Sequence, residues 1–204
     1  MTTLFLIRHA ENDFMRQHKL AGWLPGIHLN DRGRAQAQAL VPLFESARLE
    51  AVYSSPLERA LETAAPVARA HGLSVQRRAD LGEIQYGRWQ GQPLSRLRRL
   101  KLWTQVQTAP SLVTIPEGES FRHAQARIVE VLERLRTQHS GAIACFSHAD
   151  PIKLALSYFL GQPLDLFQRL MIDPASVSTL AFAEGRVRVI GINDTRATRA
   201  EGPG

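Results

Sequence analysis

The sequence has a single cysteine, Cys145, and the chain therefore cannot form an internal disulfide. A chain without disulfides suits a reducing compartment, so we predict a cytoplasmic protein. Cys145 lies inside the apolar run 142–146. Because a free cysteine in such a run behaves as a small apolar side chain, we expect it to be a buried core residue rather than a nucleophile.

Long hydrophobic runs are also absent from the sequence. No apolar stretch approaches the roughly 18 residues of a membrane-spanning helix, so no membrane partner is predicted. The short apolar stretch near the N-terminus has no basic region before it, which argues against a signal peptide. With 44% hydrophobic and 22% charged residues, the 204-residue chain has the composition of a globular protein with a sizeable core.

Lysine is rare, and arginine carries almost all of the formal net charge of +6; the only lysines are Lys19, Lys101 and Lys153. A basic balance is compatible with nucleic acid, acidic lipid or a small anionic substrate, and also with an arginine-rich codon usage alone. The basic cluster 96–101 is interleaved with leucines at the spacing of an amphipathic helix. The sequence contains no nucleic-acid-binding motif, so we predict no nucleic-acid partner.

The sequence also lacks the paired spacing that is typical of metal-binding histidines. This holds for His18, His28, His71, His123 and His139. Zinc sites need closely placed His, Cys or carboxylate ligands. We therefore predict no metal and no other cofactor.

Apolar segments alternate along the chain with segments of helical periodicity. The expected strands are 4–7, 51–54, 73–76 and 142–146, followed by a terminal hairpin of 177–182 and 187–192. Strands separated by helices form parallel sheets, whereas a hairpin adds antiparallel strands. We expect an α/β fold with a mostly parallel mixed sheet. The segment 81–116 shows no clear strand and is expected to be an insertion folded over the sheet edge.

Helix signals occur at several places between these strands. Asn30 or Asp31 should cap a helix through residues 35–43, and Pro42 should kink its last turns. A later helix is expected to begin at Pro151.

The sequence around Ser55 also predicts a helix start. Ser55 and Pro56 are typical of an N-cap and a first helical residue, which places Arg59 in the first turn. A cation there opposes the helix dipole and is poorly placed for stability. This position therefore indicates another use for Arg59, such as holding an anion.

Two of the expected strands run directly into histidines. Residues 4–7 are followed by Arg8 and His9, and residues 142–146 by Ser147 and His148. Such side chains do not belong in an apolar interior. The carboxyl ends of parallel strands form the edge at which open α/β sheets bind ligands. We expect both histidines and Arg8 to meet Arg59 at that edge.

This set of residues is suited to phosphoryl transfer without a metal. Two guanidinium groups can hold a phosphoryl group through paired hydrogen bonds. One imidazole can then attack phosphorus while the other adds positive charge. An alkoxide leaving group also needs a proton, and Glu83, which has apolar neighbours that could raise its pKa, is the candidate acid.

Several further segments follow the order of a known family. The chain resembles the histidine phosphatase superfamily, in its branch related to cofactor-dependent phosphoglycerate mutase. The segment 6–11 resembles the family's Arg-His-Gly signature. Other similar segments are 29–37, 54–64, 81–91, 118–120, 147–149 and 193–195. Together they cover most of the chain, from residue 4 to about residue 195.

The resemblance implies a fold and a division of the chain. The fold would be a three-layer α/β/α sandwich of the phosphoglycerate mutase type. Residues 1–195 would form one histidine-phosphatase domain, with the insertion 81–116 as a lid. We expect the tail 196–204 to be disordered.

The resemblance also implies roles for individual residues. His9 would become phosphorylated, and Glu83 would protonate the leaving group and later activate water. The phosphate pocket would be formed by Arg8, Asn12, Arg59, His148 and Ala149.

Three positions depart from the family pattern. Ala10 replaces the usual glycine and restricts the backbone. Asn12 stands where Ser or Thr is common, although its amide can still bond a phosphate oxygen. Met15 stands where an asparagine is common in mutases, which puts mutase activity in doubt and leaves a phosphatase step intact.

We therefore predict a metal-independent phosphomonoester hydrolase that acts through phosphohistidine on a small phosphorylated metabolite. A phosphoglycerate mutase-type phosphotransferase is the nearest alternative. A small protein-phosphohistidine phosphatase is another, although those proteins usually lack a lid. From a different class, a non-catalytic anion-binding module would use the basic surface alone. The sequence leaves the substrate undetermined and a homodimer open.

Overall fold

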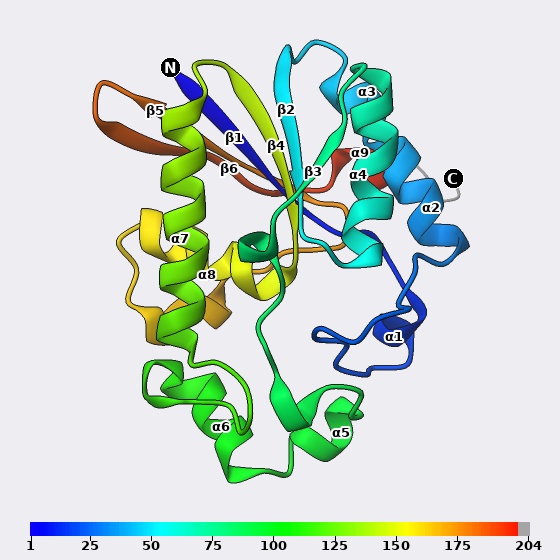
Figure 1. Cartoon of the computed structure of the whole chain (residues 1–204). Coiled ribbons are helices and arrows are strands. Elements are labelled where there is room, and N and C mark those ends of the chain that lie inside the picture. Colours follow the sequence, from blue (N-terminus) through cyan, green and yellow to red (C-terminus); the bar gives the residue numbers. More distant parts are fainter. Residues whose placement is uncertain (200–204) are drawn as a thin grey trace.

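The computed structural model describes residues 1–199 and shows a twisted sheet with helices packed on both faces (Figure 1). The strands are β1 (Thr2–Arg8), β2 (Leu49–Ser54), β3 (Val75–Arg77), β4 (Ala142–Ser147), β5 (Val177–Ala183) and β6 (Arg186–Asp194). They lie in the order β3-β2-β4-β1-β5-β6. The first four are parallel, and β5 is antiparallel to both of its neighbours. The predicted mostly parallel mixed sheet is therefore confirmed.

Helices of different lengths connect these strands. The α-helices are α1 (Asp13–Arg16), α2 (Asp31–Ala39), α3 (Val41–Phe44), α4 (Glu58–Ala70), α5 (Leu94–Leu97), α6 (Lys101–Thr108), α7 (Phe121–Gln138), α8 (Ala149–Phe159) and α9 (Arg196–Arg199). The 3-10 helices are η1 (Ala79–Leu81), η2 (Gly87–Trp89), η3 (Pro110–Leu112) and η4 (Leu164–Arg169). None of the helices within residues 1–199 has the length and hydropathy needed to cross a membrane.

The sheet separates two apolar cores, which makes the fold three-layered. Successive side chains of a strand point to opposite faces. In β4, Ile143 and Cys145 pack on the α7 and α8 side, whereas Ala144 and Phe146 pack on the α2 and α4 side. Both faces are therefore apolar, as expected for buried parallel strands. Cys145 is fully buried, as predicted.

The predicted helix starts are only partly correct. Asn30 caps α2, because its Oδ1 accepts a hydrogen bond from the Gly33 amide at 2.8 Å. The helix then breaks at Leu40, and Pro42 lies in the first turn of the separate helix α3. The helix α8 begins at Ala149 rather than Pro151.

The prediction that Ser55 caps the next helix is wrong. The helix α4 begins at Glu58, with Leu57 at its N-cap position. The Ser55 hydroxyl instead lies 2.8 Å from the Nε2 atom of His148. Arg59 nevertheless lies in the first turn of α4, as predicted.

The segment 81–116 lies beyond the carboxyl ends of the strands, near the loop that contains α1 (Figure 1). The expected single basic helix is two short helices, α5 and α6, because the extended backbone of Leu100 interrupts it. The Lys19–Pro93 bridge connects the segment to the α1 loop. Of the tail predicted to be disordered, residues 196–199 form α9, and residues 200–204 lie outside the described residues.

Candidate active site

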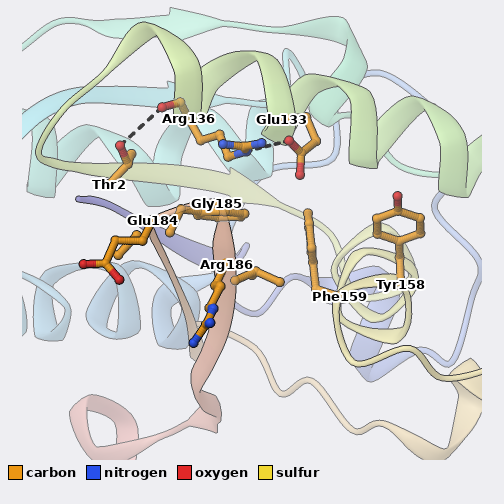
Figure 2. A pocket seen from close by; sticks show the side chains of 11 residues that line it. Thr2, Glu133, Arg136, Tyr158, Phe159, Glu184, Gly185 and Arg186 are labelled. Carbon is orange, nitrogen blue, oxygen red and sulfur yellow. Dashed lines mark hydrogen bonds and ion pairs between the residues drawn. The ribbon is translucent and has the colours of Figure 1, made fainter.

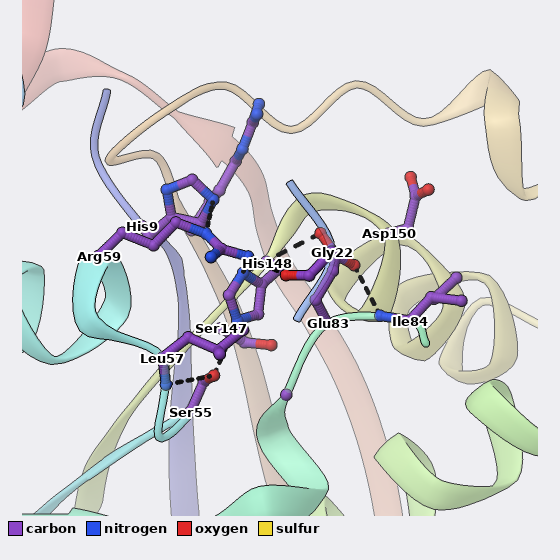
Figure 3. Close-up of polar contacts among 12 residues, drawn as sticks. His9, Gly22, Ser55, Leu57, Arg59, Glu83, Ile84, Ser147, His148 and Asp150 are labelled. Carbon is purple, nitrogen blue, oxygen red and sulfur yellow. Dashed lines mark hydrogen bonds and ion pairs between the residues drawn. The ribbon is translucent and has the colours of Figure 1, made fainter. Parts of the chain in front are cut away.

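The two strand-end histidines lie together at the carboxyl edge of the sheet. Strands β1 and β4 are parallel neighbours, and Arg8 pairs with Ser147 in their register. The next residue on each strand is therefore a histidine. The rings of His9 and His148 are 5.1 Å apart between centroids, at an angle of 62° (Figure 3).

Arg59 joins these two imidazoles from the start of α4. Its side chain is only 1% exposed. The Nε atom donates to His9 Nε2 at 3.3 Å, and Nη2 donates to His148 Nδ1 at 3.2 Å. Nη2 also donates to the Gly22 carbonyl at 2.8 Å. One guanidinium thus fixes both rings, and burial lowers its pKa to about 10.

Both imidazoles are held in the neutral form. Burial, followed by the positive charge of Arg59, places the pKa of His9 and the pKa of His148 well below the ordinary value. The His9 Nδ1–H donates to the Ala10 carbonyl at 2.7 Å. The lone pair of His9 is therefore on Nε2, on the side of Arg59. A neutral imidazole whose lone pair is on Nε2 is a competent nucleophile once the phosphoryl group replaces it as the partner of Arg59 Nε.

Glu83 lies on the other side of His148, just after η1 (Figure 3). Its Oε2 atom is 4.0 Å from His148 Nδ1, and Oε1 accepts from the Ile84 amide at 2.9 Å. Burial, followed by the negative charge of Asp150, raises the pKa of Glu83 to about 7. A carboxyl group with this pKa can release and take up a proton near neutral pH.

Three buried nitrogen donors at this edge have no partner within residues 1–199. They are Arg8 Nε, Asn12 Nδ2 and Arg59 Nη1. An unpaired buried donor costs about 1–3 kcal/mol. All three belong to residues that line one cavity of about 270 Å³, and the two arginines give that cavity positive charge suited to an anionic ligand.

The structure brings the sequence-predicted site residues together. The cavity lining includes Arg8, His9, Asn12, Arg59, Glu83 and Ala149. His148 is fully buried and lies behind this lining, where it contacts Arg59 and Glu83. Met15 also lines the cavity, and its sulfur is 3.8 Å from Arg8 Nη2.

Residues that fix the Glu83 backbone were missed in the sequence. Arg127 of α7 donates to the carbonyls of Asp80, Gly82 and Glu83 at 2.9, 3.0 and 3.2 Å. The indole of Trp23 donates to the Glu83 carbonyl at 2.6 Å. No local pattern distinguishes Arg127 from the other arginines of its helix. Asp150 was missed as well, although its place two residues after His148 could have indicated it.

A second hollow lies away from this edge. It has a volume of about 420 Å³ and is formed by α7, α8 and the turn between β5 and β6 (Figure 2). Arg136 forms an ion pair there with Glu133. Its guanidinium carbon lies over the Phe182 ring, 5.1 Å from the ring centroid. None of the predicted site residues lines this hollow.

Comparison with known proteins finds relatives that match the chain along most of its length. It is 29% identical over 201 residues to phosphoserine phosphatase 1 of Hydrogenobacter thermophilus, covering 96% of this chain and 93% of that protein. It is 27% identical over 191 residues to a 2,3-bisphosphoglycerate-dependent phosphoglycerate mutase of Thermoplasma acidophilum, covering 94% and 92%.

A solved structure supports the same relationship. The crystal structure of a phosphoserine phosphatase from Entamoeba histolytica in complex with 3-phosphoglyceric acid matches with a TM-score of 0.86 and 25% identity. The match covers 97% of this chain and 99% of that one. The predicted phosphoglycerate mutase-like fold is thereby confirmed.

The family assignment follows from residues 4–195, which match the sequence model of the histidine phosphatase superfamily (branch 1). Together with the phosphatase relatives, this match confirms the prediction of a phosphoric monoester hydrolase. The chain belongs to the histidine phosphatase superfamily, branch 1.

Proposed function

We propose that this chain hydrolyses small phosphomonoesters in the cytoplasm through a covalent phosphohistidine at His9. The observation that carries the proposal is the set of three unpaired buried donors in residues that line the same cavity as His9. The guanidinium and amide groups of these residues can hold the non-bridging oxygens of a phosphoryl group. The proposed phosphate-binding residues are Arg8, Asn12, Arg59, His148 and Ala149.

The first step forms the covalent intermediate. The lone pair of His9 Nε2 attacks phosphorus, and the bond from phosphorus to the ester oxygen breaks. Glu83, which is half protonated near pH 7, gives its proton to the leaving oxygen. An alcohol leaves, His9 carries the phosphoryl group, and Glu83 is left as a carboxylate. Arg8 and Arg59 stabilise the charge on the phosphoryl oxygens.

The second step returns the enzyme to its starting state. The Glu83 carboxylate takes a proton from a water molecule as that water attacks phosphorus. The bond between phosphorus and His9 Nε2 breaks, inorganic phosphate forms, and the imidazole recovers its lone pair. Glu83 is protonated again. The guanidinium groups of Arg8 and Arg59 supply the positive charge that a metal ion would otherwise bring.

The segment 81–116 is proposed to act as the lid of this site. It supplies Glu83, Tyr86 and Leu94 to the cavity lining, opposite the strand-end residues. A lid that carries the acid completes the catalytic site when it closes over the bound ester. The cavity of about 270 Å³ is better matched to a small metabolite than to a protein-bound phosphohistidine.

Mutase-type transfer is the second candidate, since one relative is named a phosphoglycerate mutase. A mutase must hold its phosphorylated histidine while the substrate reorients, which requires polar contacts to the acid end of phosphoglycerate. Met15 presents a thioether to the cavity at that place. Weaker binding of the acid end of phosphoglycerate favours attack of water on phosphorylated His9. A non-catalytic anion-binding module would have no need of Glu83 beside the anion.

The test combines trapping and product analysis. Rapid acid-free quenching with labelled substrate should leave a phosphoryl label on His9, and His9→Ala should lower kcat/KM at least about 10³-fold. The exposed His123→Ala variant is the matched control. Phosphoserine and 3-phosphoglycerate are the first substrates to test, with 2,3-bisphosphoglycerate added to reveal mutase activity. Retained hydrolysis in His9→Ala would refute the mechanism, and efficient formation of 2-phosphoglycerate would establish the mutase.

A further inference from the structure

The cavity lining contains a second carboxylate besides Glu83 among the described residues. This is Asp150, the second residue of α8 and two residues after His148. Its side chain is 20% exposed. The first turn of a helix favours a carboxylate, because unpaired backbone amides point toward it. Asp150 is therefore held at a fixed position, two residues after His148.

Asp150 is bonded to the segment that carries Glu83. Its Oδ2 atom accepts a hydrogen bond from the Tyr86 hydroxyl at 2.5 Å. Tyr86 is buried and lies three residues after Glu83. The other carboxylate oxygen, Oδ1, is 3.4 Å from Lys153 Nζ. The hydrogen bond from Tyr86 to Asp150 thus connects the segment 83–86 to α8.

The hydrogen bond between Tyr86 and Asp150 connects the Glu83 segment to a different element from the hydrogen bonds made by Trp23 and Arg127. Trp23 and Arg127 bind the Glu83 carbonyl from the α1 loop and from α7. Tyr86 binds the helix that begins directly after His148. The hydrogen bond between Tyr86 and Asp150 therefore connects the Glu83 segment to the helix that follows His148. The pairing joins residues that are 64 positions apart in the chain.

We propose that Asp150 is a positioning residue for the acid: it anchors Glu83 through Tyr86 and gives the cavity a second negative charge. The inference rests on the proposed function, in which Glu83 protonates the leaving oxygen. It gives the carboxylate a role in the reaction without contact to the reacting atoms.

The charges around Glu83 oppose one another. Arg8 on β1 and Arg59 on α4 favour the ionised form and lower the pKa of Glu83. Burial and Asp150 on α8 raise that pKa, and their combined effect is larger. His148 lies at 4.0 Å and is neutral, since its own pKa is far below the ordinary value.

The remaining groups near Glu83 act less directly. The Tyr86 hydroxyl stays protonated, because burial and Asp150 place its pKa well above the ordinary value. Arg127 binds the Glu83 carbonyl from α7. Lys153 lies against Asp150, and His18 and Lys19 line the cavity from the α1 loop. Removing the charge of Asp150 leaves burial alone to oppose the two arginines, so the pKa of Glu83 should fall.

The experiment measures kcat/KM against pH for an alkyl phosphate, which reports the steps through release of the alcohol. Asp150→Asn keeps an acceptor for Tyr86 and removes the charge. The basic limb of the profile should move to lower pH by roughly one unit, which lowers kcat/KM about fivefold at pH 7. With an aryl phosphate, which needs little acid, the same variant should show no such displacement.

Two control variants separate charge from anchoring. Tyr86→Phe removes the hydrogen bond and keeps the charge, so kcat/KM should fall by one common factor at every pH. Lys153→Gln removes the cation beside Asp150, and its basic limb should not move to lower pH. Thermal unfolding of each variant checks that the fold is retained.

The results for Asp150→Asn, Tyr86→Phe and Glu83→Gln distinguish failure of this inference from failure of the proposed function. An unmoved basic limb in Asp150→Asn overturns the inference, and so does an equal displacement in Tyr86→Phe. Failure of the proposed function has a different signature, because Glu83→Gln would then leave alkyl-phosphate hydrolysis intact. A displaced limb in Asp150→Asn alone, together with a loss of alkyl-phosphate hydrolysis in Glu83→Gln, supports both.

Discussion

Replacing Glu83 by glutamine should make the protein more stable above neutral pH while removing its acid. Glutamine keeps the size of the side chain and an oxygen that can accept from the Ile84 amide, which Glu83 binds at 2.9 Å. It cannot ionise. The pKa of Glu83 is raised from 4.5 to about 7, first by burial and then by Asp150.

The size and sign of the effect follow from that shift. The folded protein holds this proton more tightly than the unfolded chain, so the contribution to stability is complete below pH 4.5 and is lost as pH rises to about 7. The loss amounts to at most ~3 kcal/mol above pH 7. Glu83→Gln should therefore raise the free energy of unfolding at pH 8 by up to that amount, with little change at pH 4.5. The same variant should lower kcat/KM for an alkyl phosphate about 10²–10⁴-fold and spare an aryl phosphate.

The assay is urea unfolding at both pH values, together with kinetics on the two substrates. The matched control is Glu130→Gln, which changes an exposed carboxylate on α7 and should alter neither quantity. No stabilisation at pH 8 would show that Glu83 is not held in a raised-pKa environment. Equal losses on the alkyl and the aryl ester would show that it is not the leaving-group acid.

Two further predictions concern the positive charge of the site. Hydrolysis of an aryl phosphate should survive excess EDTA, since Arg8 and Arg59 stabilise the phosphoryl oxygens in the proposed mechanism; loss of activity with recovery on adding a divalent ion would contradict it. Arg59→Lys keeps the charge, but an ammonium group cannot span His9 Nε2 at 3.3 Å and His148 Nδ1 at 3.2 Å as the guanidinium does. The kcat/KM of Arg59→Lys should fall about 10²–10³-fold. An unchanged value would show that simultaneous hydrogen bonding of the guanidinium to both imidazoles is not needed.

Local sequence was enough to predict the strands that deliver the catalytic candidates. The apolar runs before His9 and before His148 are short, continuous and bounded by polar residues, as buried parallel strands are. Arg59 does lie in the first turn of α4, but the cap and proline signals at Ser55 and Pro56 placed the helix start too early. The error at Ser55 shows the limit of such signals. Its hydroxyl binds His148, which is 93 residues away in the chain.

Composition and short-range pattern by themselves determined the α/β class, the buried Cys145 and the residue types at the sheet edge, since periodicity and propensity are local properties. Only the tertiary structure decided that β4 lies between β1 and β2, which brings the two imidazoles to 5.1 Å. It also decided the raised pKa of Glu83, which depends on burial and on Asp150. Electric fields and desolvation depend on distances through space, and residues far apart in the chain set those distances by packing.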